Sequence, residues 1–161
     1  MLLQLYKTLV RPHLEYCVSA WSPYYEKDKI LLERIQHRFT RMIPGFKLLP
    51  YETRLDRLKL WTLEERRNRS DLLEVFKMYK GMSLLSFNQF FTISPVTNTR
   101  GHSTKIAKIR CHLDLRHYFF STRVIGRWNS LPHSVVNSTS VNSFKNGLNS
   151  MRRSKMGFFK D

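Results

Sequence analysis

Apolar residues recur at helical spacing along most of this chain. The run 28–45 shows the pattern most clearly, because one apolar stripe repeats every three or four residues and is formed by Leu31, Ile35, Phe39 and Met42. Asp28 can accept hydrogen bonds from the free N–H groups of a first helical turn, and Pro44 and Gly45 end the helix. The pattern predicts a helix over this run with the stripe on its inner face.

Two further helices are expected directly downstream. Residues 51–58 have the spacing of a short helix. Thr62 and Glu65 form a capping box, in which each side chain bonds the backbone N–H of the other residue, so a longer helix begins there and ends near Gly81. The apolar stripe of this longer helix is formed by Leu72, Val75, Phe76 and Tyr79.

The last third of the chain contains two more helical patterns. Asp114 is expected to cap a helix that ends near Leu131, with a stripe formed by Phe120, Val124, Trp128 and Leu131. Ser140 is expected to cap a final helix, whose inward residues are Val141, Phe144 and Leu148. At the other end of the chain, Leu5, Leu9 and Val10 indicate a short helix that ends at Arg11 and Pro12.

These patterns predict a mainly α fold, a small helical bundle with an irregular connector and at most a short extended segment. We expect a helical half over 1–81, a connector over 82–103 and a basic C-terminal helical half over 104–161. The connector carries many Ser, Asn and Thr residues together with Pro95 and Gly101, and residues 105–110 are the expected extended segment.

The composition adds a strong positive charge to this picture. The chain carries a formal net charge of +16, and residues 82–161 hold 12 Lys and Arg against 2 Asp and Glu. Such an excess predicts a nucleic acid or another anionic partner. Lys7 and Arg11 interrupt the apolar N-terminus, so neither a secretory signal nor a membrane span is expected. With Cys17 and Cys111 as its two cysteines, the chain is expected to be intracellular, nuclear or cytoplasmic.

Three arginines follow one border of the first apolar stripe. Arg34, Arg38 and Arg41 each precede a stripe residue, and no acidic residue stands three or four positions from any of them. Two interpretations follow. The arginines either form a solvated face whose acidic partners come from elsewhere in the fold, or they form a band that binds a polyanion. We expect these three arginines to be the primary contacts with nucleic acid.

A second group of cations has a similar setting. Arg123 and Arg127 lie along the border of the stripe through Val124 and Trp128, with no acidic residue within four positions. They are candidates for the same role, and the secondary candidates are Lys105, Lys108 and Arg110.

Motifs that support catalysis or metal binding do not occur in the sequence. Polymerases and nucleases need paired carboxylates, and the doublet Glu64-Glu65 is explained by capping. Cys111, His112 and His117 include only one thiol and do not form a four-ligand set with zinc-finger spacing. We therefore expect no catalytic residue, no metal and no cofactor.

Seven stretches of the chain resemble, in order, the region downstream of the catalytic palm in reverse transcriptases of non-LTR (LINE-type) retrotransposons, especially the jockey-like and chicken-repeat lineages. They are LYKTLVRPHLEY (5–16), AWSPYY (20–25), LLERIQHRFTRMIPG (31–45), YETRLDRLKLWTLEERRNRSDL (51–72), TRGHS (99–103), FFSTRVIGRWNSLP (119–132) and SVNSFKNGL (140–148).

The resemblance implies the function of the fragment. In that family the region includes the end of the thumb, which grips the template–primer duplex, so 1–81 is expected to be thumb-like. The palm carries the metal-binding aspartates in a motif like Phe-Ala-Asp-Asp, and Asp-Asp does not occur in this chain. The expected function is binding of RNA or an RNA–DNA duplex through phosphates without catalysis, with the remainder of a reverse transcriptase as a further partner.

Two alternatives stay open at this point. The chain can be a helical protein–protein interaction module, for which Trp21, Tyr24 and Tyr25 would be interface anchors. It can also be a degenerate retroelement remnant with no selected function. Salt-dependent RNA binding separates the interaction module from the nucleic-acid-binding domain.

Overall fold

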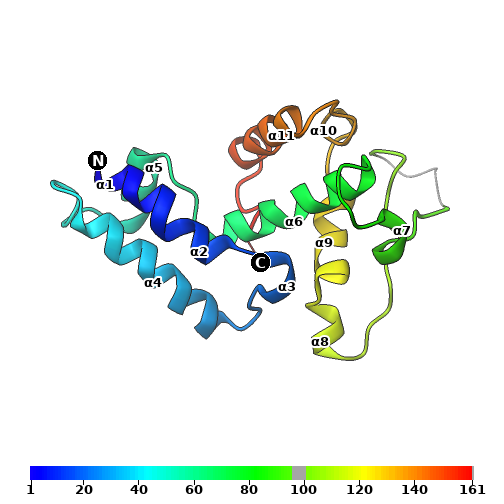
Figure 1. Ribbon diagram of the computed structural model, residues 1–161, viewed down its shortest axis with the longest axis horizontal. Coiled ribbons are helices and arrows are strands. Elements are labelled where there is room, and N and C mark those ends of the chain that lie inside the picture. The colour runs from blue at the N-terminus through cyan, green and yellow to red at the C-terminus, as the bar shows by residue number, and fades with distance from the viewer. Residues whose placement is uncertain (96–100, 161) are drawn as a thin grey trace. The chain divides into compact units, whose positions relative to one another are not determined.

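The structure, a computed structural model, describes residues 1–95 and 101–160 and is mainly α-helical, as predicted (Figure 1). Within these residues the elements are α1 (Leu2–Leu5), the π-helical η1 (Tyr6–Val10), α2 (Arg11–Glu15), α3 (Val18–Trp21), α4 (Glu26–Met42), α5 (Tyr51–Leu58), α6 (Leu63–Tyr79), α7 (Phe87–Phe90), α8 (Asp114–His117), α9 (Phe120–Asn129), α10 (His133–Val136) and α11 (Val141–Ser154).

The chain divides into two compact units, Met1–Arg67 and Asn68–Asp161, and the boundary falls within α6. No strand occurs among the described residues, and their extended pairing is limited to one antiparallel bridge between Ile93 and Ile106. Of the predicted connector, residues 96–100 lie outside the described part of the chain.

The first unit has a small apolar core. Tyr6, Leu55 and Leu60 are buried, and the ring of Tyr6 stacks on Phe39 with 4.4 Å between centroids. The N-terminal helices run alongside α4 (Figure 1). The predicted end of the N-terminal helix at Arg11 and Pro12 was wrong, since α2 continues from Arg11 to Glu15. Leu5 and Leu9 in this region are exposed. Tyr6 is buried in their place, because its ring fits against Phe39 and its hydroxyl finds a partner on α4.

The inner face of α4 is polar, which corrects the predicted stripe. Gln36 is fully buried, and its Oε1 accepts a hydrogen bond from the Tyr6 hydroxyl at 2.8 Å. Its Nε2 donates to the Tyr51 hydroxyl at 3.0 Å and to the Trp61 carbonyl at 2.9 Å. Buried polar groups need hydrogen-bond partners, and the Gln36 amide supplies them to both tyrosine hydroxyls and to the Trp61 carbonyl. In this orientation of α4 the stripe residues Leu31, Ile35 and Met42 are exposed.

The start of α4 also differs from the prediction. The helix begins at Glu26 with Tyr25 at its N-cap position, so Asp28 lies in the first turn and is not the cap. A carboxylate in the first turn still stabilises the positive end of the helix dipole.

The local signals around α5 and α6 are confirmed. α5 spans Tyr51–Leu58, as predicted. The capping box at α6 is complete, because Thr62 N–H donates to Glu65 Oε2 at 3.0 Å and Glu65 N–H donates to Thr62 Oγ1 at 3.1 Å. Glu64, the other acid of the doublet, pairs with Lys29 Nζ at 2.8 Å.

The second unit is built around aromatic residues. Phe76 of α6 stacks on Phe144 of α11 with 4.2 Å between centroids, and Trp128 of α9 is fully buried beside them. The predicted cap of the last helix is confirmed, since Ser143 N–H donates to Ser140 Oγ at 3.1 Å. The predicted stripe is buried throughout and comprises Phe120, Val124 and Trp128 of α9 and Leu131, which follows the end of that helix.

The single helix predicted from Asp114 to Leu131 is two helices. α8 ends at His117 and α9 begins at Phe120, with Phe119 extended between them. Asp114 is the first residue of α8 and does not cap it. The break coincides with a change in packing, because Leu115 is exposed whereas Phe120 is buried. The apolar contacts that hold α9 in place are therefore not continued into α8.

Candidate nucleic-acid interface

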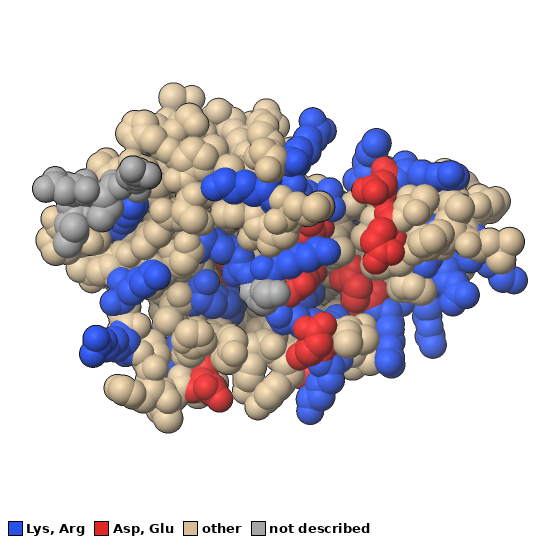
Figure 2. Space-filling model, turned by 180° about the vertical axis from the view of Figure 1, so that it is seen from behind, with Lys and Arg blue, Asp and Glu red and all other residues tan. Residues whose placement is uncertain are grey.

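The three arginines of α4 form one exposed row. Arg34, Arg38 and Arg41 lie on the surface, on the side of the helix away from the buried residues Gln36 and Thr40. No described residue forms a hydrogen bond or an ion pair with any of the three guanidinium groups. On the face of the molecule in Figure 2, Lys and Arg side chains cover far more of the surface than acidic ones.

The row shares its surface with apolar side chains. Ile30, Leu31, Ile35 and Met42 are all at least 40% exposed. This combination follows from the orientation of α4. Because the face that carries Gln36 is buried, both the arginines and the predicted apolar stripe lie on the exposed part of the helix. The surface therefore offers both guanidinium donors and apolar contact area.

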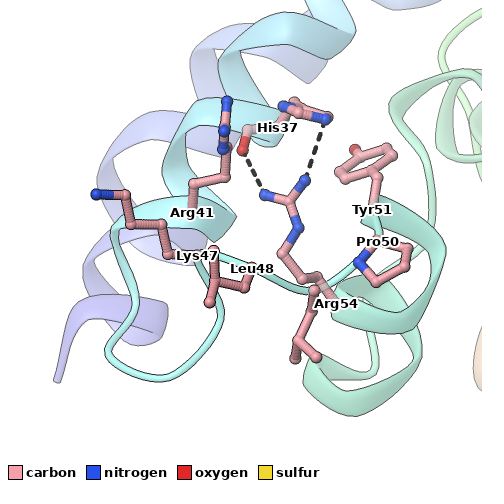
Figure 3. Close-up of a pocket in the computed structure, with 8 residues that line it drawn as sticks. His37, Arg41, Lys47, Leu48, Pro50, Tyr51 and Arg54 are labelled. Atoms are coloured by element: carbon pink, nitrogen blue, oxygen red, sulfur yellow. Dashed lines mark hydrogen bonds between the residues drawn. The ribbon is translucent and has the colours of Figure 1, made fainter.

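A pocket lies at the end of the row, between the last turns of α4 and the first turn of α5 (Figure 3). It has a volume of about 460 Å³, and its cationic or titratable lining comes from His37, Arg41, Lys47 and Arg54. The remaining lining is Leu48, Leu49, Pro50 and Tyr51. Gly45, with φ at +79°, lets the loop between the two helices reverse direction.

Arg54 is held in the floor of this pocket by neutral groups. Its Nη1 donates to the His37 carbonyl and to Thr40 Oγ1, both at 2.9 Å. Its Nη2 lies 3.0 Å from His37 Nε2, and since a guanidinium can only donate, the imidazole accepts there and is neutral. Its carbon Cζ lies 5.3 Å from the centre of the Tyr51 ring. Figure 3 shows the guanidinium between His37 and the Leu48 side chain.

The electrostatics of the pocket agree with this geometry. Burial, followed by the charges of Arg54 and Arg41, lowers the pKa of His37 below its ordinary value. Burial, followed by the charge of Arg41, also lowers the pKa of Arg54. A neutral His37 is the form that accepts the hydrogen bond from Arg54. The pocket therefore gathers positive charge and keeps its imidazole uncharged.

The candidates in the second unit have different surroundings. Arg123 is bound to the carboxylate of Asp71, 52 residues earlier in the chain. Arg127 and Lys105 are half-buried, whereas Lys108 and Arg110 are exposed. The structure thus gathers Arg34, Arg38 and Arg41 in one row, while Lys105, Lys108, Arg110, Arg123 and Arg127 belong to the other unit.

Sequence reasoning did not identify the pocket residues His37, Lys47 and Arg54. Arg54 stands in an ordinary amphipathic helix with acidic neighbours Glu52 and Asp56, so its spacing carries no sign of burial. The loop 43–50 has no periodicity that would bring Lys47 toward α4. Only the packing of α5 against α4 brings these side chains together.

Other site types find no support in the described part of the chain. Within residues 1–95 and 101–160, no group of three or more His, Cys, Asp or Glu side chains is arranged to hold a metal ion. None of the described helices is long and apolar enough to cross a bilayer.

Comparison with known proteins gives no relative. No protein-family model, no curated protein and no solved structure matches the chain.

Proposed function

We propose that the chain is a non-catalytic nucleic-acid-binding fragment of a non-LTR retrotransposon reverse transcriptase, which grips RNA or the template–primer duplex through phosphate contacts. The motif resemblance over nearly the whole chain suggests this origin. The observation that carries the proposal is the row Arg34, Arg38 and Arg41, which is exposed and has no partner among the described residues.

The row has a suitable length for a nucleic-acid strand. Arg41 follows Arg34 by seven positions, which corresponds to about 10.5 Å along the axis of a helix. At about 3.4 Å of duplex axis per phosphate of one strand, this distance spans about three phosphates. Guanidinium groups bind phosphate oxygens in a fork geometry that a lysine cannot provide.

The charge of each unit favours an anionic partner as well. Residues 1–67 hold 13 Lys and Arg against 8 Asp and Glu, and residues 68–161 hold 15 against 4. A net positive field accelerates association with a polyanion at low ionic strength. In this proposal the protein is intracellular and its second partner is the remainder of the reverse transcriptase.

A protein–protein interaction module is the second candidate function. Trp21 and Tyr25 are 40% and 54% exposed, and the ring of Tyr24 lies 4.1 Å from that of Tyr25. Exposed aromatic residues are common at the centres of protein interfaces. This candidate predicts binding that depends on the aromatic residues and responds weakly to salt.

The test of nucleic-acid binding is a titration of labelled single-stranded RNA by fluorescence anisotropy at several salt concentrations. The row variant replaces Arg34, Arg38 and Arg41 with Gln, and the loss of three contacts should flatten the slope of log affinity against log salt by about 2. The matched control replaces three exposed cations outside the row with Gln, namely Lys27, Arg57 and Lys155.

The control variant has the same net charge as the row variant. If its salt slope stays near the wild-type value, the flatter slope of the row variant is due to the location of the three arginines and not to the lower net charge. Gln is nearly as good a helix former as Arg, and both variants should melt near the wild-type temperature. Equal slopes for the two variants would refute the row as the contact surface.

The proposal also predicts no polymerase activity. The sequence lacks an Asp-Asp pair with which to bind catalytic metals. Pure protein should not extend a primed RNA template in Mg²⁺ or Mn²⁺. Nucleotide incorporation above the level in buffer would contradict the non-catalytic assignment.

A further inference from the structure

We infer that the pocket between the end of α4 and the start of α5 binds a phosphate ester group. The inference rests on the proposed function and deepens it, because it names the place where a phosphate of the bound nucleic acid enters the fold. An internal phosphodiester and a terminal phosphate share this chemistry, and the experiment below distinguishes them.

The burial of Arg54 is the first support. Its side chain is 2% exposed, and its Nε–H is buried without a hydrogen-bond partner. Arginine is almost never fully buried unless it is paired with an acid. Here the partners are a carbonyl, a hydroxyl and a neutral imidazole, so hydrogen bonds are formed but the charge is not cancelled.

The surroundings of Arg54 contain a second positive charge. Arg41 lowers the pKa of Arg54, and the opposing contributions of Tyr51 and Glu52 are each smaller than that of Arg41. None of the eight residues that line the pocket is acidic. An anion in the pocket would supply the missing charge, and water cannot hydrate Arg54 in its place because the side chain is buried.

Arg41 and Lys47 supply the direct contacts at the mouth. Both side chains are exposed, and neither forms an ion pair with a described residue. Figure 3 shows the two side chains on the same side of Arg54, with Pro50 and Tyr51 on the other. An anion between Arg41 and Lys47 would lie above the buried charge of Arg54.

The form of the site favours phosphate over carboxylate. Its volume of about 460 Å³ falls within the range of small-ligand pockets, roughly 300–1,000 Å³. Positive groups come from three segments, namely α4, the loop 43–50 and α5, so an anion would have more than one donor to bind. A phosphate has oxygens for several such donors, whereas a carboxylate has two oxygens in one plane. The apolar lining, Leu48, Leu49 and Pro50, carries no charge that would oppose the binding of an anion.

The pocket is continuous with the arginine row. Arg41 lines the pocket and is also the last member of the row that begins at Arg34. A strand that follows the row toward the end of α4 therefore arrives at the pocket, and one of its phosphates can enter there.

The first experiment observes Arg54 directly in the full chain. Its Nε–H resonance is followed by two-dimensional ¹H–¹⁵N NMR and is assigned by its loss in Arg54→Lys. Addition of inorganic phosphate should shift this resonance saturably, whereas chloride at equal ionic strength should not. A resonance that does not shift with phosphate would overturn the inference. A resonance that shifts equally with acetate would also overturn it, because the site would then bind carboxylates as well as phosphates.

The second experiment measures RNA affinity with variants that keep the buried residues intact. The pocket variant is Lys47→Gln, which leaves the row Arg34, Arg38 and Arg41 unchanged, and its control is Lys27→Gln, which removes the same charge from another exposed position. The pocket variant should lose at least about tenfold more affinity than the control, since one charged hydrogen bond of typical strength corresponds to such a factor.

Paired oligonucleotides identify the source of the phosphate. If a 5′-phosphate increases affinity in the wild type and in the control but not in the pocket variant, the pocket takes the terminal phosphate. If the pocket variant loses affinity equally for 5′-phosphate and 5′-hydroxyl RNA, it takes an internal phosphodiester. Both results support the inference.

The failure of the inference is distinguishable from the failure of the proposed function. RNA binding with equal losses in the pocket and control variants would refute the pocket while the proposed function stands. A saturable phosphate shift at Arg54 without RNA binding would refute the proposed function while the anion site stands.

Discussion

Arg123 of α9 grips the carboxylate of Asp71 on α6 with two donors. Its Nε lies 2.8 Å from Oδ2 and its Nη2 lies 3.2 Å from Oδ1. Arg34 of α4, like Arg123, has no acidic residue three or four positions away in the sequence, and it forms no ion pair with a described residue. The two arginines therefore differ in the role that the structure gives them, and stability measurements can separate those roles.

The first prediction is that Arg123→Gln lowers the free energy of unfolding, whereas Arg34→Gln leaves it nearly unchanged. Asp71 is buried and would lose two charged donors, a change that costs about 2 kcal/mol. Urea denaturation followed by circular dichroism measures both variants. A double-mutant cycle with Asp71→Asn checks the pairing, and a coupling energy near zero would show that the pair is not stabilising.

The second prediction concerns two neighbouring residues of α4. Gln36→Ala should destabilise the chain by about 2 kcal/mol or more, because the buried hydroxyl of Tyr6 and carbonyl of Trp61 lose their partner. Ile35→Ala should cost much less, because Ile35 is 40% exposed. The apolar pattern of the sequence predicts the opposite order. Thermal melts of the two variants measure this order. A larger fall in melting temperature for Ile35→Ala than for Gln36→Ala would contradict the prediction and place the apolar stripe in the core.

The third prediction is that Trp128→Ala damages folding more than binding. Trp128 is fully buried, and its Nε1 donates to the Thr104 carbonyl at 3.0 Å. Truncation of such a residue costs about 3–5 kcal/mol, a large share of the stability of a typical domain. Trp21→Ala is the comparison at an exposed tryptophan, and its melting temperature should fall less. An unchanged melting temperature for Trp128→Ala would exclude its core role.

The fourth prediction is a loss of stability in mild acid. His102 is buried, its Nε2–H donates to the Trp128 carbonyl, and burial lowers its pKa below the ordinary value. Between the lowered pKa and about 6.5, the unfolded chain binds more protons than the folded chain. The free energy of unfolding should therefore rise with pH in that window and level off above it.

His102→Gln removes the titrating group and keeps a side-chain N–H that can reach the same carbonyl. Its free energy of unfolding should depend less steeply on pH than that of the wild type when urea melts are compared at pH 5.5 and 7.5. Equal pH dependences would mean that His102 does not contribute to the acid sensitivity.

The sequence by itself determined the elements whose signals are local. The bounds of α5, the capping box of Thr62 and Glu65, and the cap at Ser140 all follow from residues within one or two helical turns. The burial of Phe120, Val124 and Trp128 also follows from spacing, because every third or fourth residue of a helix returns to the same face.

The tertiary structure decided which face of α4 is buried and which cations have partners. Gln36 turns inward because the hydroxyls of Tyr6 and Tyr51, 30 and 15 residues away in the chain, need a hydrogen-bonding partner. Arg123 meets an acid 52 residues away. Periodicity shows which residues share one face of a helix. Burial and ion pairing depend instead on which side chains of another segment pack against that face. For that reason the arginine row was visible in the sequence, and the pocket around Arg54 became visible only in the fold.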